Sequence, residues 1–239
     1  MSSNNKPVVA FPLYKDCTLL DFAGATQVFA WAGYQTLWLA ETLEPILTSE
    51  GVRVQPTATF KEKQTVFMLF VPGGGGEGVS ASMRCPAMQG FVKQTARQAQ
   101  WSGCVCTGAF IIAAAGLLDG CEATTYWSLL DTLALFPELS VTTDAYPRYL
   151  IDSNKKRFSG GGVSSSIDVA LELVRSINGL KAANTTDLSI QYAPNPPVKS
   201  GDPGQASPSL VNSTLAGQQD SLIKPITNAT RKVLGIGVG

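Results

Sequence analysis

Residues 101–120, "WSGCVCTGAFIIAAAGLLDG", join a short apolar run to a helical pattern with almost no loop between them. The apolar run predicts a buried strand over 101–106, and the pattern after it predicts a helix that Gly120 ends. A strand that passes directly into a helix through a sharp turn lifts the side chain at the turn above the carboxyl edge of the sheet. Cys106 occupies that turn, at the edge where open α/β folds bind their ligands.

Strand-like and helix-like stretches alternate along the rest of the chain. We expect strands over 8–13, 35–40, 66–71 and 148–153, and helices over 19–33, 86–100 and 164–180. Gly33 and Gly179 stand where the first and the last of these helices should stop. This alternation, with short glycine turns, indicates an α/β fold with a mostly parallel sheet covered by helices on both faces.

The C-terminal part of the chain has a different character. Residues 192–210, "YAPNPPVKSGDPGQASPSL", hold five of the fourteen prolines and cannot form a helix interior or a central strand. One amphipathic stretch follows over 209–234, and it is too short for a second domain. We therefore expect a single domain over residues 1–239, with a proline-rich arm (192–208) and a C-terminal helix (209–234) packed on it.

Composition and charge argue against several functional classes. The 239 residues include eighteen basic and eighteen acidic side chains, so the chain lacks the positive excess of proteins that bind nucleic acid or anionic membranes. No apolar run approaches the ~20 residues of a transmembrane helix, and the polar start "MSSNNKP" does not resemble a signal peptide. Five cysteines without a CxxC pair are typical of reduced thiols, which favours a cytoplasmic protein.

The glycine loop at residues 73–78, "GGGGEG", formally satisfies the dinucleotide-binding pattern GxGxxG. That site also needs an acidic residue about 20 positions later, and none occurs between Val79 and Leu118. A P-loop is excluded too, because no Lys-Ser or Lys-Thr follows Gly78. The loop is then either a tight turn or a source of backbone N–H groups for a developing negative charge. We expect neither a cofactor nor a metal.

Cys106 has two interpretations on the residues alone. It is either a small buried side chain, as free cysteines usually are, or a nucleophile at the start of the helix that Thr107 begins. The partial positive charge of a helix N-terminus would lower the pKa of its thiol. Cys104 belongs deeper in the strand and is expected to be structural. The chain contains no histidine, so a Cys–His catalytic pair is excluded.

Six motifs occur in an order that resembles one protein family. They are "LLDFAG" (19–24), "VPGGGG" (71–76), "CTGAFIIAAAGLLDG" (106–120), "ATTYW" (123–127), "SGGGVSSSIDVALEL" (159–173) and "YAPNPP" (192–197). Together, over roughly residues 7–235, they resemble the ThiJ/PfpI superfamily, and within it most of all the isonitrile hydratases. The resemblance implies a class I glutamine amidotransferase-like fold, which is a flavodoxin-like three-layer α/β sandwich, and a homodimer.

The resemblance also implies a set of site residues. It places the nucleophile at Cys106, on an elbow with a strained backbone, and an acidic residue beside it at Asp21. The hydroxyl and the backbone of Thr107 would donate hydrogen bonds into the site. The loop at Gly74 and Gly75 would supply further backbone donors to the substrate.

Four other positions keep two interpretations each. Asp21 lies inside an apolar stretch and needs a partner, yet it could serve only as the cap of a helix that starts at Phe22. Tyr126 stands where related sequences often carry histidine, and Tyr126 and Trp127 form either a pocket wall or simple packing. Asp168 resembles a buried structural acid in a first helical turn more than a catalytic one.

One nucleophile and one acid/base carboxyl are sufficient to hydrate an isonitrile, R–N≡C, to an N-substituted formamide through a thioimidate. Two alternatives stay open. In the first, the same pair acts on another small electrophile, in a glyoxalase-like reaction or in a lyase or cyclisation step of specialised metabolism. In the second, the chain is a non-catalytic sensing domain. In each case we expect a small-molecule ligand, and neither nucleic acid nor a membrane as a partner.

Overall fold

The computed structural model describes residues 6–237, which contain a seven-stranded sheet in the order β5-β2-β1-β6-β7-β9-β8. The strands are β1 (Val8–Pro12), β2 (Gln35–Ala40), β5 (Ala58–Thr59), β6 (Met68–Val71), β7 (Trp101–Val105), β8 (Tyr149–Asp152) and β9 (Arg157–Gly160). Neighbouring strands are parallel except β8, which runs antiparallel to β9 at one edge. Two further strands, β3 (Ile46–Leu47) and β4 (Arg53–Val54), form a separate antiparallel pair.

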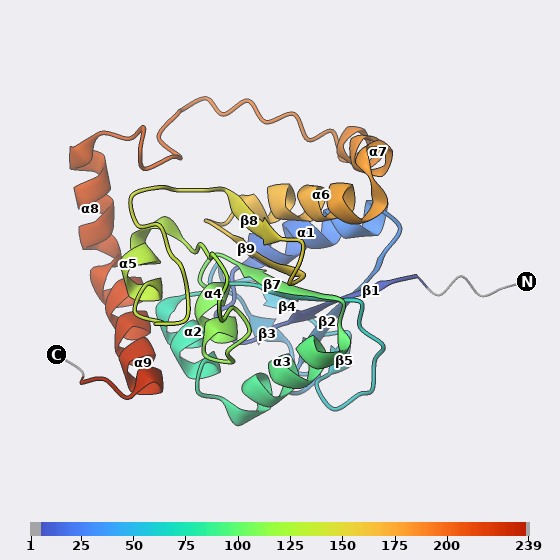
Figure 1. Cartoon of the computed structure of the whole chain (residues 1–239), viewed down its shortest axis with the longest axis horizontal. Coiled ribbons are helices and arrows are strands. Elements are labelled where there is room, and N and C mark those ends of the chain that lie inside the picture. The colour runs from blue at the N-terminus through green and yellow to red at the C-terminus, as the bar shows by residue number, and fades with distance from the viewer. Residues whose placement is uncertain (1–5, 238–239) are drawn as a thin grey trace, which may run out of the picture.

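Helices cover both faces of the sheet (Figure 1). One face carries α1 (Leu19–Trp31) and α6 (Ser165–Asn178), and α7 (Leu180–Ile190) follows α6. The opposite face carries α2 (Gly76–Ser82), α3 (Pro86–Gln98) and α4 (Gly108–Ala113). The predicted flavodoxin-like α/β fold is confirmed.

The central strands are buried on both faces, as parallel strands between two helical layers must be. Every residue of β6 and β7 is buried. The ring of Phe70 lies with its centroid 5.2 Å from those of both Phe11 in β1 and Phe158 in β9. Gly103 in β7 makes room for this cluster, because a Cβ atom there would lie 2.1 Å from the carbonyl oxygen of Phe158. This core holds the carboxyl ends of the strands in place.

Several segments differ from the expectation based on sequence. The helix after Cys106 ends at Ala113 and not at Gly120, because the chain turns through Gly116, whose φ is +73°. Strand β9 is missing from the sequence-based expectation, since its residues "RFSG" have no apolar alternation; their pairing with β7 keeps them extended. Helix α7 is a further element that the sequence pattern does not indicate.

The C-terminal segment begins as an extended arm, which crosses the molecule from the end of α7 to α8 (Pro208–Gln218) (Figure 1). A π-helical turn, η2 (Gln219–Ile223), and α9 (Lys224–Leu234) complete it. The predicted C-terminal helix is therefore present, with one π turn inside it. It packs beside α5 (Leu130–Leu133), where the hydroxyl oxygens of Thr132 and Thr227 are 2.8 Å apart. Within residues 6–237, no helix has both the length and the apolar character needed to cross a membrane.

Candidate active site

Cys106 forms the turn between β7 and α4 and has a positive φ of 54°. Such a conformation is strained for a residue with a Cβ atom, so it persists only where the surroundings hold it. The N–H of Cys106 is shared between the carbonyl oxygens of Gly160 (3.0 Å) and Gly161 (2.9 Å). Its own carbonyl accepts a hydrogen bond from the hydroxyl of Thr125 at 2.8 Å. These contacts fix the elbow, and only 5% of the Cys106 surface is exposed.

Asp21 lies fully buried in the first turn of α1. Its Oδ2 atom accepts a hydrogen bond from the backbone N–H of Gly73 at 2.8 Å. Its Oδ1 atom is buried and has no hydrogen-bond partner among residues 6–237, and the carboxyl group lies within reach of the Cys106 thiol. The helix begins at Leu19 and not at Phe22, so the interpretation of Asp21 as a helix cap is wrong.

Both groups of this pair have raised pKa values. Burial raises the pKa of Asp21 to about 8, although the Gly73 N–H opposes the shift. Burial and then the charge of Asp21 raise the pKa of the Cys106 thiol well above its usual value, and the backbone and hydroxyl of Thr107 offset part of this. The N–H of Thr107 at the start of α4 does lower this pKa, but burial outweighs it, so the net direction is opposite to the one predicted for a helix N-terminus. Both shifts favour the protonated forms of the two groups.

The glycine loop contacts the site differently from the expectation. The Gly74 N–H donates to the hydroxyl oxygen of Thr107 at 2.8 Å, and that hydroxyl donates back to the Gly74 carbonyl at 2.9 Å. The Gly75 N–H donates to the carbonyl oxygen of Asp16 at 2.9 Å. Both N–H groups that the resemblance assigns to the substrate thus have partners within the protein, and they stabilise the loop around Thr107.

Gly73 is a site residue that the sequence reasoning missed. A Cβ atom on it would lie 2.6 Å from the Thr107 hydroxyl oxygen, 2.7 Å from the Thr107 nitrogen and 2.8 Å from Asp21 Oδ2. Any side chain here would collide with both neighbours of the thiol. The signal was present in the sequence, since Gly73 is the first glycine after the strand.

Tyr14 and Cys17 also lie close to the pair, on the loop after β1. The Tyr14 hydroxyl donates to the Pro72 carbonyl at 3.0 Å, and burial, with the nearby Cys17, Asp21 and Cys106, raises its pKa. Cys17 forms a β-bridge with Gly74, and burial raises the pKa of its thiol to about 12. The loop also lines a cavity of about 550 Å³, which extends toward α2 and α3.

Tyr126 follows Thr125, whose hydroxyl holds the elbow, and its ring covers Gly162. Its hydroxyl oxygen accepts a hydrogen bond from the side-chain amide of Gln218 in α8 at 2.8 Å. The Trp127 ring lies beside it, with the centroids 5.9 Å apart. The loop 125–127 and the end of α8 therefore meet next to the segment that holds Cys106.

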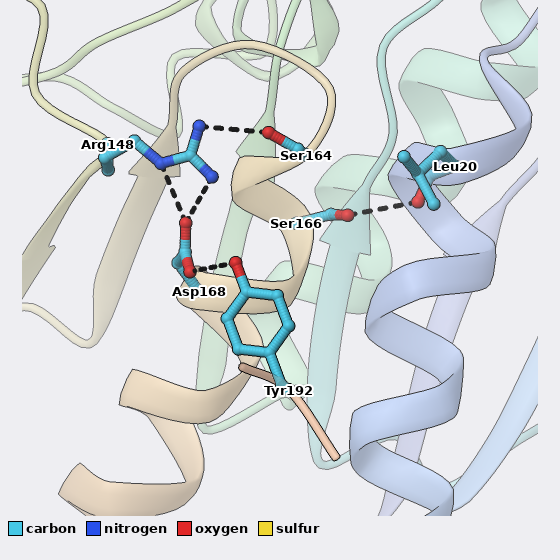
Figure 2. A network of polar contacts seen from close by, with 6 residues as sticks. All are labelled: Leu20, Arg148, Ser164, Ser166, Asp168 and Tyr192. Atoms are coloured by element: carbon cyan, nitrogen blue, oxygen red, sulfur yellow. Dashed lines mark hydrogen bonds and ion pairs between the residues drawn. The ribbon is translucent and has the colours of Figure 1, made fainter. Parts of the chain in front are cut away.

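Asp168 lies in the first turn of α6 (Figure 2). Its carboxylate pairs with Arg148 and accepts a hydrogen bond from the Tyr192 hydroxyl at 2.7 Å. Its side chain is 22% exposed, so it is half-buried and not the buried acid that the sequence predicts. Within residues 6–237, no three Cys, Asp or Glu side chains converge on a possible metal position.

Known proteins similar to this chain agree with the observed fold and motifs. Isonitrile hydratase of Pseudomonas putida is 34% identical over 205 residues, which are 85% of this chain and 86% of that protein. The HTH-type transcriptional regulator GbdR of Pseudomonas aeruginosa is 28% identical over 185 residues, 74% of this chain and 48% of the regulator.

Solved structures of similar proteins have the same fold as this chain. The crystal structure of a ThiJ/PfpI family protein from Pseudomonas syringae matches 97% of this chain and 91% of its own, with a TM-score of 0.85 and 27% identity. Oxidized DJ-1 of Toxoplasma gondii shares the fold, with a TM-score of 0.68 and 21% identity over 79% of this chain and 100% of its own. The model of the DJ-1/PfpI family matches residues 8–175. The chain belongs to the DJ-1/PfpI family.

Proposed function

We propose that this protein is an enzyme that hydrates isonitriles to N-substituted formamides, with Cys106 as the nucleophile and Asp21 as the general acid and base. One observation carries the proposal. A fully buried carboxyl group, whose burial favours the protonated form, lies within reach of a thiol on a strained elbow. Similarity to the isonitrile hydratase of Pseudomonas putida supports this choice of substrate.

The first step forms the thioimidate. The terminal carbon of R–N≡C must gain one bond to sulfur and one to hydrogen. Asp21 gives its proton to this carbon and accepts the thiol proton of Cys106, while the sulfur attacks the same carbon. The product is R–N=CH–S–Cys106, and the carboxyl group is again neutral. The backbone N–H of Thr107 stabilises the negative charge that develops on sulfur, as its effect on the thiol pKa indicates, and the Thr107 hydroxyl does so after turning away from the Gly74 carbonyl.

The second step consumes one water molecule. Its oxygen attacks the thioimidate carbon; Asp21 takes a water proton and delivers its own to the nitrogen, which gives R–NH–CH(OH)–S–Cys106. The C–S bond then breaks, and the hydroxyl proton returns to sulfur through Asp21. The formamide R–NH–CHO leaves and the thiol is restored. Every step uses side chains of this chain only, without cofactor or metal.

The remaining site residues form the surroundings of this pair. Tyr126 and Trp127 are the wall against which the R group lies, and the N–H groups of Gly74 and Gly75 act on the substrate after exchanging their present partners. We further propose that the chain works as one domain in a cytoplasmic homodimer, with the arm 192–208 near the partner. A monomeric mass in light scattering at micromolar concentration would contradict the dimer.

The test is to incubate the protein with cyclohexyl isocyanide and, separately, with methylglyoxal, and to measure N-cyclohexylformamide and lactate. We expect formamide from the wild type and none from Cys106→Ser. Cys104→Ser is the matched control, because Cys104 is fully buried in the same strand and should affect stability alone. Lactate without formamide would assign the pair to glyoxalase-like chemistry. If neither formamide nor lactate forms, a sensing role is favoured.

A further inference from the structure

Residues 160–166, which we call the bridge segment, contact both of the elements that carry the proposed catalytic pair. On one side, the carbonyl oxygens of Gly160 and Gly161 accept the N–H of Cys106. On the other side, the hydroxyl of Ser166 donates to the carbonyl oxygen of Leu20, the residue before Asp21, at 3.0 Å. The position of the bridge segment therefore affects the alignment of Cys106 with Asp21.

A polar cluster of Arg148, Asp168 and Tyr192 holds the bridge segment from outside (Figure 2). The Nε atom of Arg148 donates to Asp168 Oδ2 at 2.8 Å, and Nη2 donates to the same oxygen. The Nη1 atom of Arg148 donates to the hydroxyl of Ser164 at 3.0 Å, and the Arg148 carbonyl accepts the N–H of Gly161 at 3.0 Å. Arg148 thus holds the bridge segment through its side chain and through its backbone.

Tyr192 joins the cluster to the proline-rich arm. It lies just after α7, and its hydroxyl donates to Asp168 Oδ1 at 2.7 Å, so both carboxylate oxygens have partners. Burial and this hydrogen bond raise the pKa of Tyr192 to about 12, which keeps the donor protonated. The start of the arm is thereby connected to the first turn of α6.

The stability of the fold does not explain this cluster well. The side chains of Arg148 and Asp168 are 49% and 22% exposed, and an exposed ion pair contributes only about 0–1 kcal/mol. Three of its four side-chain hydrogen bonds nevertheless hold Arg148 and Tyr192 to Asp168, and the fourth joins Arg148 to Ser164 in the segment that supports a strained nucleophile. Misplacement of a catalytic group by about 1 Å can cost roughly a hundredfold in rate.

We propose that Arg148, Asp168 and Tyr192 are positioning residues, which hold the bridge segment so that Cys106 and Asp21 stay aligned. The start of the proline-rich arm is then part of the support of the active site. This inference rests on the proposed function for its catalytic consequence. The structural consequence, an altered environment of the Cys106 thiol in the variants, does not depend on the proposed function.

The experiment compares Tyr192→Phe and Asp168→Asn with Glu172→Gln. Glu172 is the matched control, because it forms an ion pair with Arg175 on the same helix, more than one turn beyond Asp168. Three quantities are measured for each variant: kcat and KM with cyclohexyl isocyanide, the melting temperature, and the rate of Cys106 alkylation by iodoacetamide from pH 6 to 10. Peptide mass spectrometry assigns the alkylated cysteine.

We expect Tyr192→Phe and Asp168→Asn to lower kcat by roughly tenfold or more, with KM almost unchanged, and to shift the pH profile of alkylation. Glu172→Gln should leave kcat, KM and the alkylation profile as in the wild type, and any change should be confined to the melting temperature, because its contacts are with Arg175 and Ser176. Wild-type kcat and alkylation in the Tyr192 and Asp168 variants would overturn the proposal, as would an equal loss in Glu172→Gln. If the wild type forms no formamide, the proposed function fails, and the alkylation profiles still test the positioning role. Tyr192→Phe removes one hydroxyl only, so we expect it to fold. It can therefore test the proposal even if Asp168→Asn does not fold.

Discussion

The Oδ2 atom of Asp21 accepts a hydrogen bond from the Gly73 N–H at 2.8 Å, and a Cβ atom on Gly73 would lie 2.8 Å from that same oxygen. The residue that binds the carboxyl group is therefore also one that leaves no room for a side chain. Asp21 is fully buried, and the Gly73 N–H is the only hydrogen-bond donor to its carboxyl group among residues 6–237.

Gly73→Ala should impair the site and destabilise the fold. The added methyl group meets the Thr107 nitrogen and Asp21, which cannot both move away, so we expect a loss of about 1–3 kcal/mol in the free energy of unfolding. Turnover should fall at least tenfold. Urea unfolding and formamide assays measure the two effects.

Gly90→Ala is the control for that substitution. Gly90 lies inside α3, and a Cβ atom there meets nothing within 4 Å. Alanine should therefore raise stability by about 0.5–1 kcal/mol through helix propensity and leave turnover unchanged. If Gly73→Ala leaves stability and turnover as Gly90→Ala does, the contact between Gly73 and Asp21 is not needed for activity.

Asp21→Asn should become more stable than the wild type as the pH rises. The pKa of Asp21 is about 8 in the folded protein, against 3.8 for an unperturbed aspartate, so the folded state binds this proton more tightly than the unfolded chain. Its contribution to stability is full below pH 3.8 and is lost as the pH rises through about 8. Asparagine carries no such proton.

The measurement is urea unfolding of both proteins at several pH values between 4 and 9. The stability difference in favour of Asp21→Asn should grow by several kcal/mol over this range, since each pKa unit corresponds to about 1.4 kcal/mol. Glu77→Gln, at an exposed position in α2, controls for the loss of a carboxylate. A difference that stays constant with pH would show that Asp21 ionises normally in the folded state.

The rate of isonitrile hydration should fall at alkaline pH. The first step needs Asp21 in its neutral form, so kcat/KM should be level below pH 7 and decline as the pH rises through about 8. Asp21→Asn should lower the rate by at least ~10²-fold and abolish this decline. A wild-type rate that keeps increasing to pH 10 would point instead to a reaction limited by free thiolate.

Asp21→Glu should separate hydration from other chemistry at the same pair. The longer side chain displaces the carboxyl by about one methylene from its Gly73 donor toward Cys106, which should reduce hydration substantially. Formamide and lactate are measured with the two substrates named above. Unchanged hydration would mean that the position of the carboxyl is not critical. Lost hydration with a gain of methylglyoxal turnover would show that the aspartate sets the reaction class.

Apart from the fold class, the features that the sequence predicts correctly are local ones. The strands over 8–12 and 68–71 and the stops of α1 and α6 follow from periodicity and from glycines over windows of a few residues. The position of Cys106 at the strand–helix turn is also a local feature, because it follows from the residues next to it in the sequence. Motif order then adds the acid, Asp21, which no periodicity would single out.

Other features depend on packing between distant residues. Asp21 and Gly73 are 52 positions apart, and strand β9 is extended because β7 lies beside it. The pKa of Cys106 follows burial and the charge of Asp21, although the sequence of the elbow predicts the opposite direction. The cluster of Arg148, Asp168 and Tyr192 joins three segments that no motif connects. Backbone preferences act over a single turn or strand, whereas desolvation and hydrogen-bond partners exist only once remote segments are brought together.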